Sequence, residues 1–392
     1  MTTDRVVYMD NNATTRVAPE VIEAMMPYLT TWYGNPSSMH TFGGQVRHAI
    51  EKARGQVATL IGAQPEEITF TSCGTESDNT AILSALENDV RRRQVVTTRI
   101  EHPAVLGLCK VLQRRGYHIE YCPVNNRGQV CTDALARMIT DETAIVSVMW
   151  ANNETGNVLP VHEIADLAHA HGALVHTDAV QAVGKLPINL ARSNIDFLSL
   201  SGHKLHAPKG IGALYVRRGV PLNQYLIGGH QEFGRRAGTE NVPGIVALGK
   251  AAELAQAHLD EERTRVAELR DVLESGILGA CPDSRVNGNP PNRLPNTTNI
   301  SFYYVEGEAI LLHLNEFGVA ASSGSACTSG SLEPSHVLRA MGVPEIGLHG
   351  SIRFSLCRYN TRGEVDYVIA RLPPIITELR AISPYGRQAR GE

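Results

Sequence analysis

Short apolar runs alternate with amphipathic runs along the first three-fifths of the chain, and their two periods predict strands and helices in turn. Residues 143–150 form a nearly continuous apolar run, as expected of a strand that is buried on both faces of a sheet. Strands are predicted at 67–72, 94–99, 143–150, 173–178 and 195–201. Helices are predicted at 45–62, 78–86, 103–115 and 161–171, with glycines closing three of them at 62, 116 and 172. This alternation predicts βαβ units and a mostly parallel sheet, and therefore an α/β fold.

The pattern changes after Val242-Pro243-Gly244. A helical stretch from about 245 to 278 leads out of the first unit, and an Asn- and Pro-rich coil follows at 286–296. The remaining predicted elements are strands at 299–303, 319–322 and 350–356 and a helix at 308–317. We therefore expect two domains: a large one of residues 15–255, and a smaller one of residues 1–14 and 256–392.

Composition narrows the class of protein. Apolar residues make up 43% of the 392 residues, enough to bury a sizeable core, so a disordered chain is excluded. The formal net charge of −4 argues against a nucleic-acid binder, and no apolar run is long enough to predict a membrane span. The N-terminus lacks the basic and apolar regions of a secretion signal. Seven cysteines without a C-x-x-C pair favour a reducing, cytoplasmic setting over a disulfide framework or a metal site.

Ligands of open α/β sheets bind beyond the carboxyl ends of the strands, so the residues that follow each predicted strand are candidates for chemistry. After 67–72, Gly74 and Thr75 precede a helix whose free N–H groups can bind a phosphate; an ordinary capped helix is the alternative. His102 follows 94–99 and can stack on a flat ring, move a proton or simply serve a turn. Asn153 follows 143–150 in a segment rich in turn residues.

Charged residues follow the next two strands. Asp178 ends the strand 173–178, with Gln181 three residues on, and a buried acid there either meets a cation or caps a helix. Lys204 comes shortly after the strand 195–201, preceded by Ser201 and His203. A buried amine is stabilised as an imine or in an ion pair, whereas a lysine at the surface extends its ammonium into water.

Together these residues predict a site for pyridoxal phosphate (PLP). Lys204 can condense with the aldehyde, Asp178 can keep the pyridine nitrogen protonated, and His102 can cover the ring. Hydroxyl and N–H groups at the start of the helix can hold the phosphate. The chain lacks the G-x-G-x-x-G and G-x-x-x-x-G-K-[ST] motifs by which such sheets bind dinucleotides and nucleoside triphosphates.

Two further candidates lie in the second unit. Cys327 stands in a loop, about 321–331, made only of small residues, which predicts a mobile segment with an exposed, reactive thiol. The other six cysteines lie in apolar or helical contexts and are expected to be buried, although Cys73 adjoins the phosphate cradle. Arg353 interrupts an apolar strand, where its guanidinium can bind a carboxylate or form a structural ion pair.

The chain resembles the cysteine desulfurases along essentially its whole length, and among them the NifS type associated with nitrogenase. The motifs that carry the resemblance are YMDNNATT (8–15), YGNPSS (33–38), EHP (101–103), VMWANNETG (148–156), DAVQ (178–181), SGHK (201–204), RRAGTEN (235–241) and SGSAC (323–327). It implies the aspartate-aminotransferase-like fold, fold type I of the PLP-dependent enzymes. That fold has a large cofactor-binding domain on a mostly parallel seven-stranded sheet and a smaller α/β domain, here carrying the cysteine loop.

The resemblance also implies a role for each matching residue. Lys204 binds PLP covalently and acts in catalysis, together with His102, which stacks on the ring, and Cys327, which accepts the sulfur. Asp178 pairs with the pyridine nitrogen and Gln181 with the phenolic oxygen. The implied phosphate contacts are Gly74, Thr75, Ser201 and His203, together with Thr239 of a second subunit. Asn153 is implied to lie beside the ring and the substrate carboxylate. Arg353, with Asn35, is implied to bind that carboxylate.

The implied activity is removal of sulfur from L-cysteine, which gives L-alanine and a persulfide on Cys327. The sulfur is expected to serve iron–sulfur cluster assembly, as in nitrogen fixation. The implied partners are a second copy, in a homodimer, and a scaffold protein of the NifU or IscU kind. The alternatives are a selenocysteine lyase, another PLP-dependent lyase or aminotransferase, and a non-catalytic relative that binds a scaffold.

Overall fold

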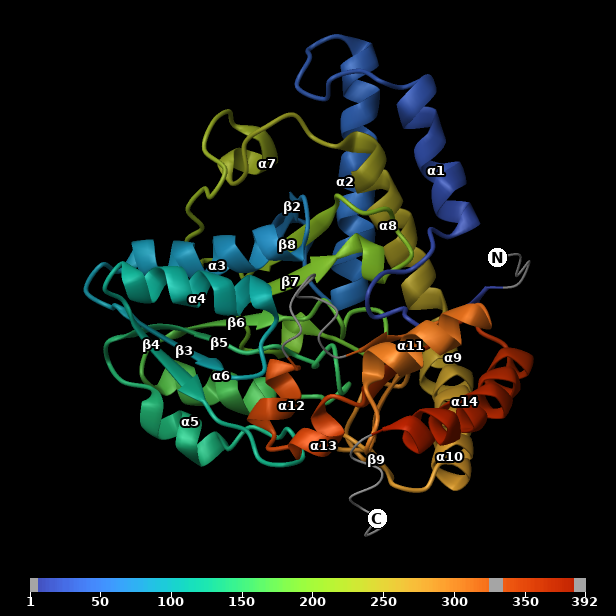
Figure 1. Cartoon of the computed structure of the whole chain (residues 1–392). Coiled ribbons are helices and arrows are strands. Elements are labelled where there is room, and N and C mark those ends of the chain that lie inside the picture. The colour runs from blue at the N-terminus through green and yellow to red at the C-terminus, as the bar shows by residue number, and fades with distance from the viewer. Residues whose placement is uncertain (1–5, 324–333, 384–392) are drawn as a thin grey trace.

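The computed structural model describes residues 6–323 and 334–383 (Figure 1). The first unit is built on a seven-stranded sheet of order β2-β8-β7-β6-β5-β3-β4. Its strands are β2 Ile68–Thr71, β3 Gln94–Thr98, β4 His118–Cys122, β5 Thr143–Ser147, β6 Leu174–Asp178, β7 Phe197–Ser201 and β8 Gly212–Val216. Strands β4, β3, β5, β6 and β7 are parallel to their neighbours in this series, whereas β8 is antiparallel to both β7 and β2. The predicted mostly parallel α/β sheet is confirmed.

Helices cover both faces of this sheet, as Figure 1 shows. On one face lie α3 Gly74–Asn88 and α4 Pro103–Arg114, and on the other α5 Thr132–Met138 and α6 Val161–Ala170. A group of three further helices packs together beside the sheet: α1 Pro19–Thr30, α2 Thr41–Ile61 and α8 Val242–Ala257. The short α7 Gln231–Gly234 precedes α8. With apolar helices on both faces, the central strands are buried throughout, which explains their nearly continuous apolar sequences.

A second apolar core lies in the other unit. There β1 Val7–Tyr8 pairs in parallel with β11 Val319–Ala320, beside an antiparallel sheet of order β12-β13-β10-β9. These strands are β12 Ser322–Ser323, β13 Ser351–Ser355, β10 Thr297–Phe302 and β9 Ser284–Val286. Their helices are α10 Ala267–Ala280, α11 Gly307–Glu316 and α14 Arg362–Ile382. We propose that the two units correspond to the two domains expected above.

The helical stretch predicted at about 245–278 consists of several segments. After α8 come α9 Leu259–Glu261 and a π-helical turn, Glu262–Val266, before α10 begins. The remaining short helices are α12 His336–Ala340, which contributes Val337 and Leu338 to the core of the first unit, and α13 Glu345–Leu348. Among the described residues, no helix is long and apolar enough to cross a membrane.

Candidate active site

A cavity of about 450 Å³ lies where the first unit meets Arg353 of β13. Ten of the residues selected from the sequence line it: Gly74, Thr75, His102, Asn153, Asp178, Gln181, Ser201, His203, Lys204 and Arg353. Parallel strands bring their carboxyl ends to the same edge of a sheet, and the register aligns Asp178 of β6 with Ser199 of β7. Residues spread over 280 positions of the sequence therefore face one space.

Lys204 is held at this edge by the N-terminal segment of the chain. It ends a short 3₁₀ turn, Gly202–Lys204, directly after β7. Its Nζ donates to the carbonyl oxygens of Asn12 at 2.5 Å and Ala13 at 2.7 Å. Thr15 continues the contact, because its N–H and hydroxyl both bind the carbonyl of His203. Backbone carbonyls thus stabilise a lysine side chain that is partly removed from water.

Asp178 ends β6 and is buried in the cavity wall. Its Oδ1 accepts the Val180 N–H at 2.9 Å, so the local capping anticipated as an alternative is present. The pKa of Asp178 is raised to about 6, chiefly by burial and in smaller part by the nearby Asp78 carboxylate. A cation bound in the cavity next to Asp178 would relieve this desolvation.

Asp78 is a second buried carboxylate of the cavity, and the sequence analysis missed it. It lies in the second turn of α3, and its Oδ1 has no hydrogen-bond partner among the described residues. The nearest basic nitrogen is Nε2 of His176, 3.4 Å away. Burial lowers the pKa of His176 to about 4, so this imidazole is neutral at neutral pH, and it bonds Ser147 and Ser199 instead. Burial also raises the pKa of Asp78 to about 6.

The start of α3 forms a cradle without side-chain caps. Cys73 is its N-cap but makes no side-chain hydrogen bond to the first turn, so the N–H groups there remain available to an anion. A Cβ added at Gly74 would lie 2.7 Å from Cγ2 of Val180, so these two residues of the cavity wall could not both keep their positions. His203 lies across from this turn and is fixed by a 3.1 Å contact between its Nδ1 and the Thr14 hydroxyl.

His102 is the N-cap of α4. Its Nδ1 accepts the Ala104 N–H at 3.1 Å, so the proton of the neutral ring resides on Nε2. The preceding Glu101 is fully buried; its carboxylate accepts the Met149 N–H and the Thr98 hydroxyl, and burial raises its pKa to about 8. These bonds fix the loop that presents the imidazole to the cavity.

The side chain of Gln181 is oriented by contacts with Asn12 and Lys185. Its Nε2 donates to the Asn12 carbonyl at 2.9 Å, and its Oε1 lies 3.4 Å from Nζ of Lys185. Lys185 is buried, which lowers its pKa to about 8. One N–H of Nε2 is therefore used by Asn12, and because Gln181 lines the cavity, the other N–H can serve an acceptor there.

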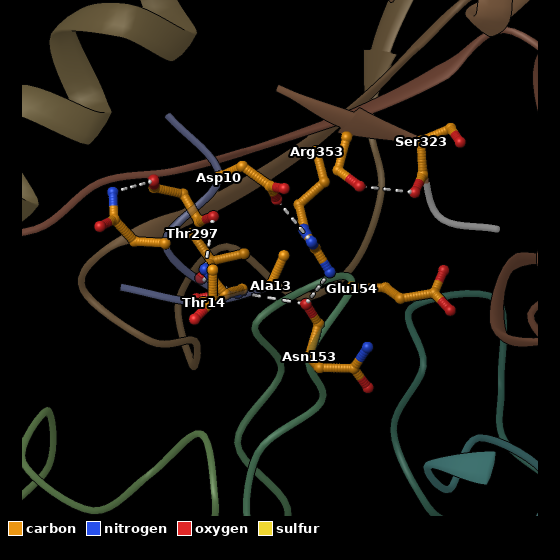
Figure 2. A network of polar contacts seen from close by, with 12 residues as sticks. Asp10, Ala13, Thr14, Asn153, Glu154, Thr297, Ser323 and Arg353 are labelled. Carbon is orange, nitrogen blue, oxygen red and sulfur yellow. Dashed lines mark hydrogen bonds and ion pairs between the residues drawn. The ribbon is translucent and has the colours of Figure 1, made fainter. Parts of the chain in front are cut away.

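Arg353 enters the cavity from β13 and meets two acceptors of its own chain. Nη2 contacts Oδ1 of Asp10 at 2.8 Å, and Nη1 donates to the Asn153 carbonyl at 3.0 Å (Figure 2). The ion pair that the sequence left open is therefore present, within the cavity wall. Asp10 belongs to the motif 8–15, but the sequence analysis gave it no role.

Two predicted site residues do not line this cavity, and a third is not described by the structure. Cys327 lies outside the described residues. Asn35 and Thr239 are exposed and do not line the cavity of their own chain. Of the other cysteines, Cys109, Cys122, Cys281 and Cys357 are buried, and Cys73 is half-buried in the cavity wall.

One prediction about the cysteines is wrong. Cys131 is exposed, because it caps α5 at the surface rather than packing in the core.

The chain belongs to the aminotransferase class-V family, which matches residues 7–368. It is 61% identical over 386 residues to a cysteine desulfurase of Trichormus azollae, covering 98% of this chain and 96% of that protein. It is 58% identical over 380 residues to the cysteine desulfurase NifS of Azotobacter vinelandii, covering 97% and 94%. A solved NifS-like protein superposes with a TM-score of 0.90 at 40% identity, covering 96% and 100%. The fold is thus fold type I of the PLP-dependent enzymes.

The residues present fit PLP. The uncapped start of α3 suits its phosphate, the buried carboxylate of Asp178 suits a protonated pyridine, and Lys204 supplies a primary amine. The absence of a side chain at Gly74 lets the first turn of α3 pack closely against Val180 in the cavity wall.

Proposed function

We propose that this chain is a PLP-dependent cysteine desulfurase, which converts L-cysteine to L-alanine and keeps the sulfur as a persulfide on Cys327. The observation that carries the proposal is the convergence of Lys204, Asp178, His102 and Arg353 on one cavity, in a chain about 60% identical to proteins named cysteine desulfurases. Arg353 supports an amino acid as substrate because its guanidinium can bind a carboxylate.

When bound, PLP supplies an electron sink that stabilises negative charge on Cα of the amino acid. Asp178 would pair with its pyridine nitrogen, and Gln181 with its phenolic oxygen. His102 and Asn153 would lie beside the ring, and Gly74, Thr75, Ser201 and His203 would hold the phosphate. Lys204 provides the amine that binds the aldehyde. The donors and the carboxylate of this set line the same cavity, which supports each assignment.

The chain's own residues would then move protons and sulfur. Arg353 holds the substrate carboxylate, and the Lys204 amine takes the proton from Cα. The Cys327 thiolate attacks the substrate sulfur, and the C–S bond breaks with its electron pair on the β-carbon, which is then protonated. Lys204 returns a proton to Cα, which gives alanine. The sulfur stays on Cys327 as a persulfide, so the step needs no outside oxidant.

Cys327 itself lies outside the described residues, but one described flank lines the cavity and the other binds a residue next to His102. Ser322, five residues before it, lines the cavity. His336, nine residues after it, donates from Nε2 to the carbonyl of Glu101 at 2.9 Å, next to His102. Both flanks therefore support a thiol acting at this cavity.

The test compares alanine and sulfide formation from L-cysteine in the wild-type holoenzyme and in Cys327→Ala. The variant should keep the cofactor absorbance and its change on adding cysteine, but lose persulfide formation and turnover. Cys131→Ala, which removes an exposed cysteine remote from the cavity, is the matched control and should turn over normally. Sustained turnover by Cys327→Ala contradicts the proposal. Faster reaction with selenocysteine, or consumption of a keto acid, would favour the lyase or the aminotransferase.

We further propose that two copies assemble and that Thr239, and with it Asn35, contribute to a site across the interface. Large apolar side chains near both residues are exposed in the single chain: Tyr33 and Met39 near Asn35, and Ile227 and Phe233 near Thr239. Apolar surface of this kind marks protein interfaces. A dilution series in analytical ultracentrifugation tests the assembly.

The sulfur is proposed to pass to a scaffold protein for iron–sulfur cluster assembly, in the cytoplasm. The relative named NifS supports this role, and the free thiols among the described cysteines are compatible with a reducing compartment. Transfer of labelled sulfur from the persulfide to a scaffold of the NifU kind tests it.

A further inference from the structure

The guanidinium proposed to bind the substrate carboxylate already has a carboxylate partner. Figure 2 shows Asp10 and Arg353 side by side, with the Asn153 carbonyl on the other branch of the guanidinium. The side chain of Arg353 is 2% exposed and that of Asp10 is 19% exposed, and both line the cavity. An amino acid that places its carboxylate on Arg353 therefore brings it next to the negative charge of Asp10.

A ligand that carries only a carboxylate is poorly suited to this place. The same cavity holds the buried carboxylates of Asp78 and Asp178, and like charges repel strongly where water is excluded. An α-amino acid is a zwitterion with no net charge. It avoids the repulsion if its ammonium group faces Asp10.

The position of Lys204 indicates where the ammonium group of the substrate would lie. Its Nζ is bound to the carbonyls of Asn12 and Ala13, and the Ala13 N–H in turn bonds the Asp10 carbonyl at 3.0 Å. Segment 10–13 is therefore a tight turn with Asp10 at one end and the Lys204 amine at the other. An amino group that approaches Lys204 from Arg353 passes along this turn.

We propose that Asp10 accepts a hydrogen bond from the α-ammonium group of the incoming amino acid while Arg353 holds its carboxylate, so that the pair selects zwitterionic α-amino acids. The inference rests on the proposed function and adds a specificity-determining residue to it. The exchange conserves interactions: the substrate carboxylate replaces Asp10 on one N–H of Arg353, and the substrate ammonium replaces the guanidinium on Asp10. Each new contact is a charge-assisted hydrogen bond.

The test compares two ligands in the wild-type holoenzyme and in Asp10→Asn. L-Cysteine is followed by its KM for alanine formation, and 3-mercaptopropionate, which is cysteine without its amine, by calorimetric binding. The KM for cysteine should rise about tenfold, the effect of one lost hydrogen bond to a charged group. Binding of 3-mercaptopropionate should become about threefold tighter, because a nearby like charge has been removed. Asp10→Glu should restore the preference of the wild type.

Opposite changes for the two ligands support the proposal. If both ligands bind more weakly, Asp10 only aligns Arg353 and the proposal is overturned; if neither changes, it is overturned as well. Asp89→Asn is the matched control, because Asp89 pairs with Arg91 on the surface through two hydrogen bonds. A wild-type holoenzyme that forms no alanine from cysteine contradicts the proposed function, whatever the two ligands do in the variant.

Discussion

The proposed cofactor end of the cavity, with Asp178 and Asp78, and the proposed substrate end, with Asp10 and Arg353, balance charge in different ways. Asp178 ends a buried strand, where its pKa is raised by burial and by a second carboxylate. Asp10 instead comes from the N-terminal segment and forms an ion pair with Arg353 at 2.8 Å. The cofactor end thus suits a cation, whereas at the substrate end the charges of Asp10 and Arg353 already offset each other, and a ligand carboxylate on Arg353 would have to replace Asp10.

The largest effect is expected from Asp178→Asn. An amide cannot hold the pyridine nitrogen protonated, so alanine formation should fall by about 10²- to 10³-fold, as for other removals of a preorganised electrostatic group. Steady-state rates and the absorbance of the bound cofactor measure it. Asp89→Asn, the same change at the surface, should keep full activity. Wild-type rates in Asp178→Asn would contradict the role of the cofactor end.

Arg353→Leu breaks the substrate end. It leaves the partly buried Asp10 carboxylate without its partner, so the cofactor-free protein should lose about 3 kcal/mol of unfolding free energy. Urea unfolding measures the loss. Adding Asp10→Asn to Arg353→Leu should recover part of it, because the unpaired charge is then gone. Strictly additive losses would show that the two side chains do not stabilise each other.

The pH dependence of stability separates the two ends. The pKa values of Asp178 and Asp78 are about 6 in the folded protein, above the ordinary 3.8. Between pH 4 and 6 the folded state therefore binds more protons than the unfolded state, and stability falls as the pH rises through this window. Each of the two carboxyl groups accounts for a loss of at most about 3 kcal/mol of unfolding free energy across this window, at about 1.4 kcal/mol per pKa unit.

Asp178→Asn should reduce that slope in the cofactor-free protein. Urea unfolding of the wild type and the variant at several pH values between 4 and 7 measures the difference. Identical slopes would contradict the raised pKa of Asp178. The control substitution Asp89→Asn, at a partly buried surface ion pair, should not reduce the fall in stability in this window.

The smallest effect is expected from Gly74→Ala. The added Cβ would lie 2.7 Å from Cγ2 of Val180, so the cradle must shift, and the affinity for PLP should fall about tenfold, by analogy with overpacked sites. Fluorescence titration of the cofactor-free protein with PLP measures it. Gly107→Ala in α4 is the control, because its Cβ meets open space. Unchanged PLP affinity in Gly74→Ala would show that the start of α3 accommodates the added Cβ without loss of binding.

The cofactor end was largely predictable from the sequence, whereas at the substrate end Arg353 was predicted but its partner Asp10 was not. Strands β5, β6 and β7 are recognisable in the sequence as apolar runs. The candidate residues at their ends follow because ligands bind beyond the carboxyl ends of parallel strands. Edge strand β4 was missed because polar residues such as Glu120 interrupt it, and Asp78 because a carboxylate in the second turn of a helix is usually solvated. The pairing of Asp10 with Arg353 joins residues 343 positions apart, which no local pattern predicts.

The segment 7–15 has a consequence for how the molecule is assembled on the ribosome. It is translated well before its partners: β1 pairs with β11, the Asn11 N–H and side chain bind the Ser355 carbonyl, and Asp10 pairs with Arg353. Domains tend to fold in order of synthesis. We therefore expect Asp10 and Asn11 to stay without these partners until β13 has been translated, and a nascent chain arrested before residue 350 to lack the ion pair of Asp10 with Arg353.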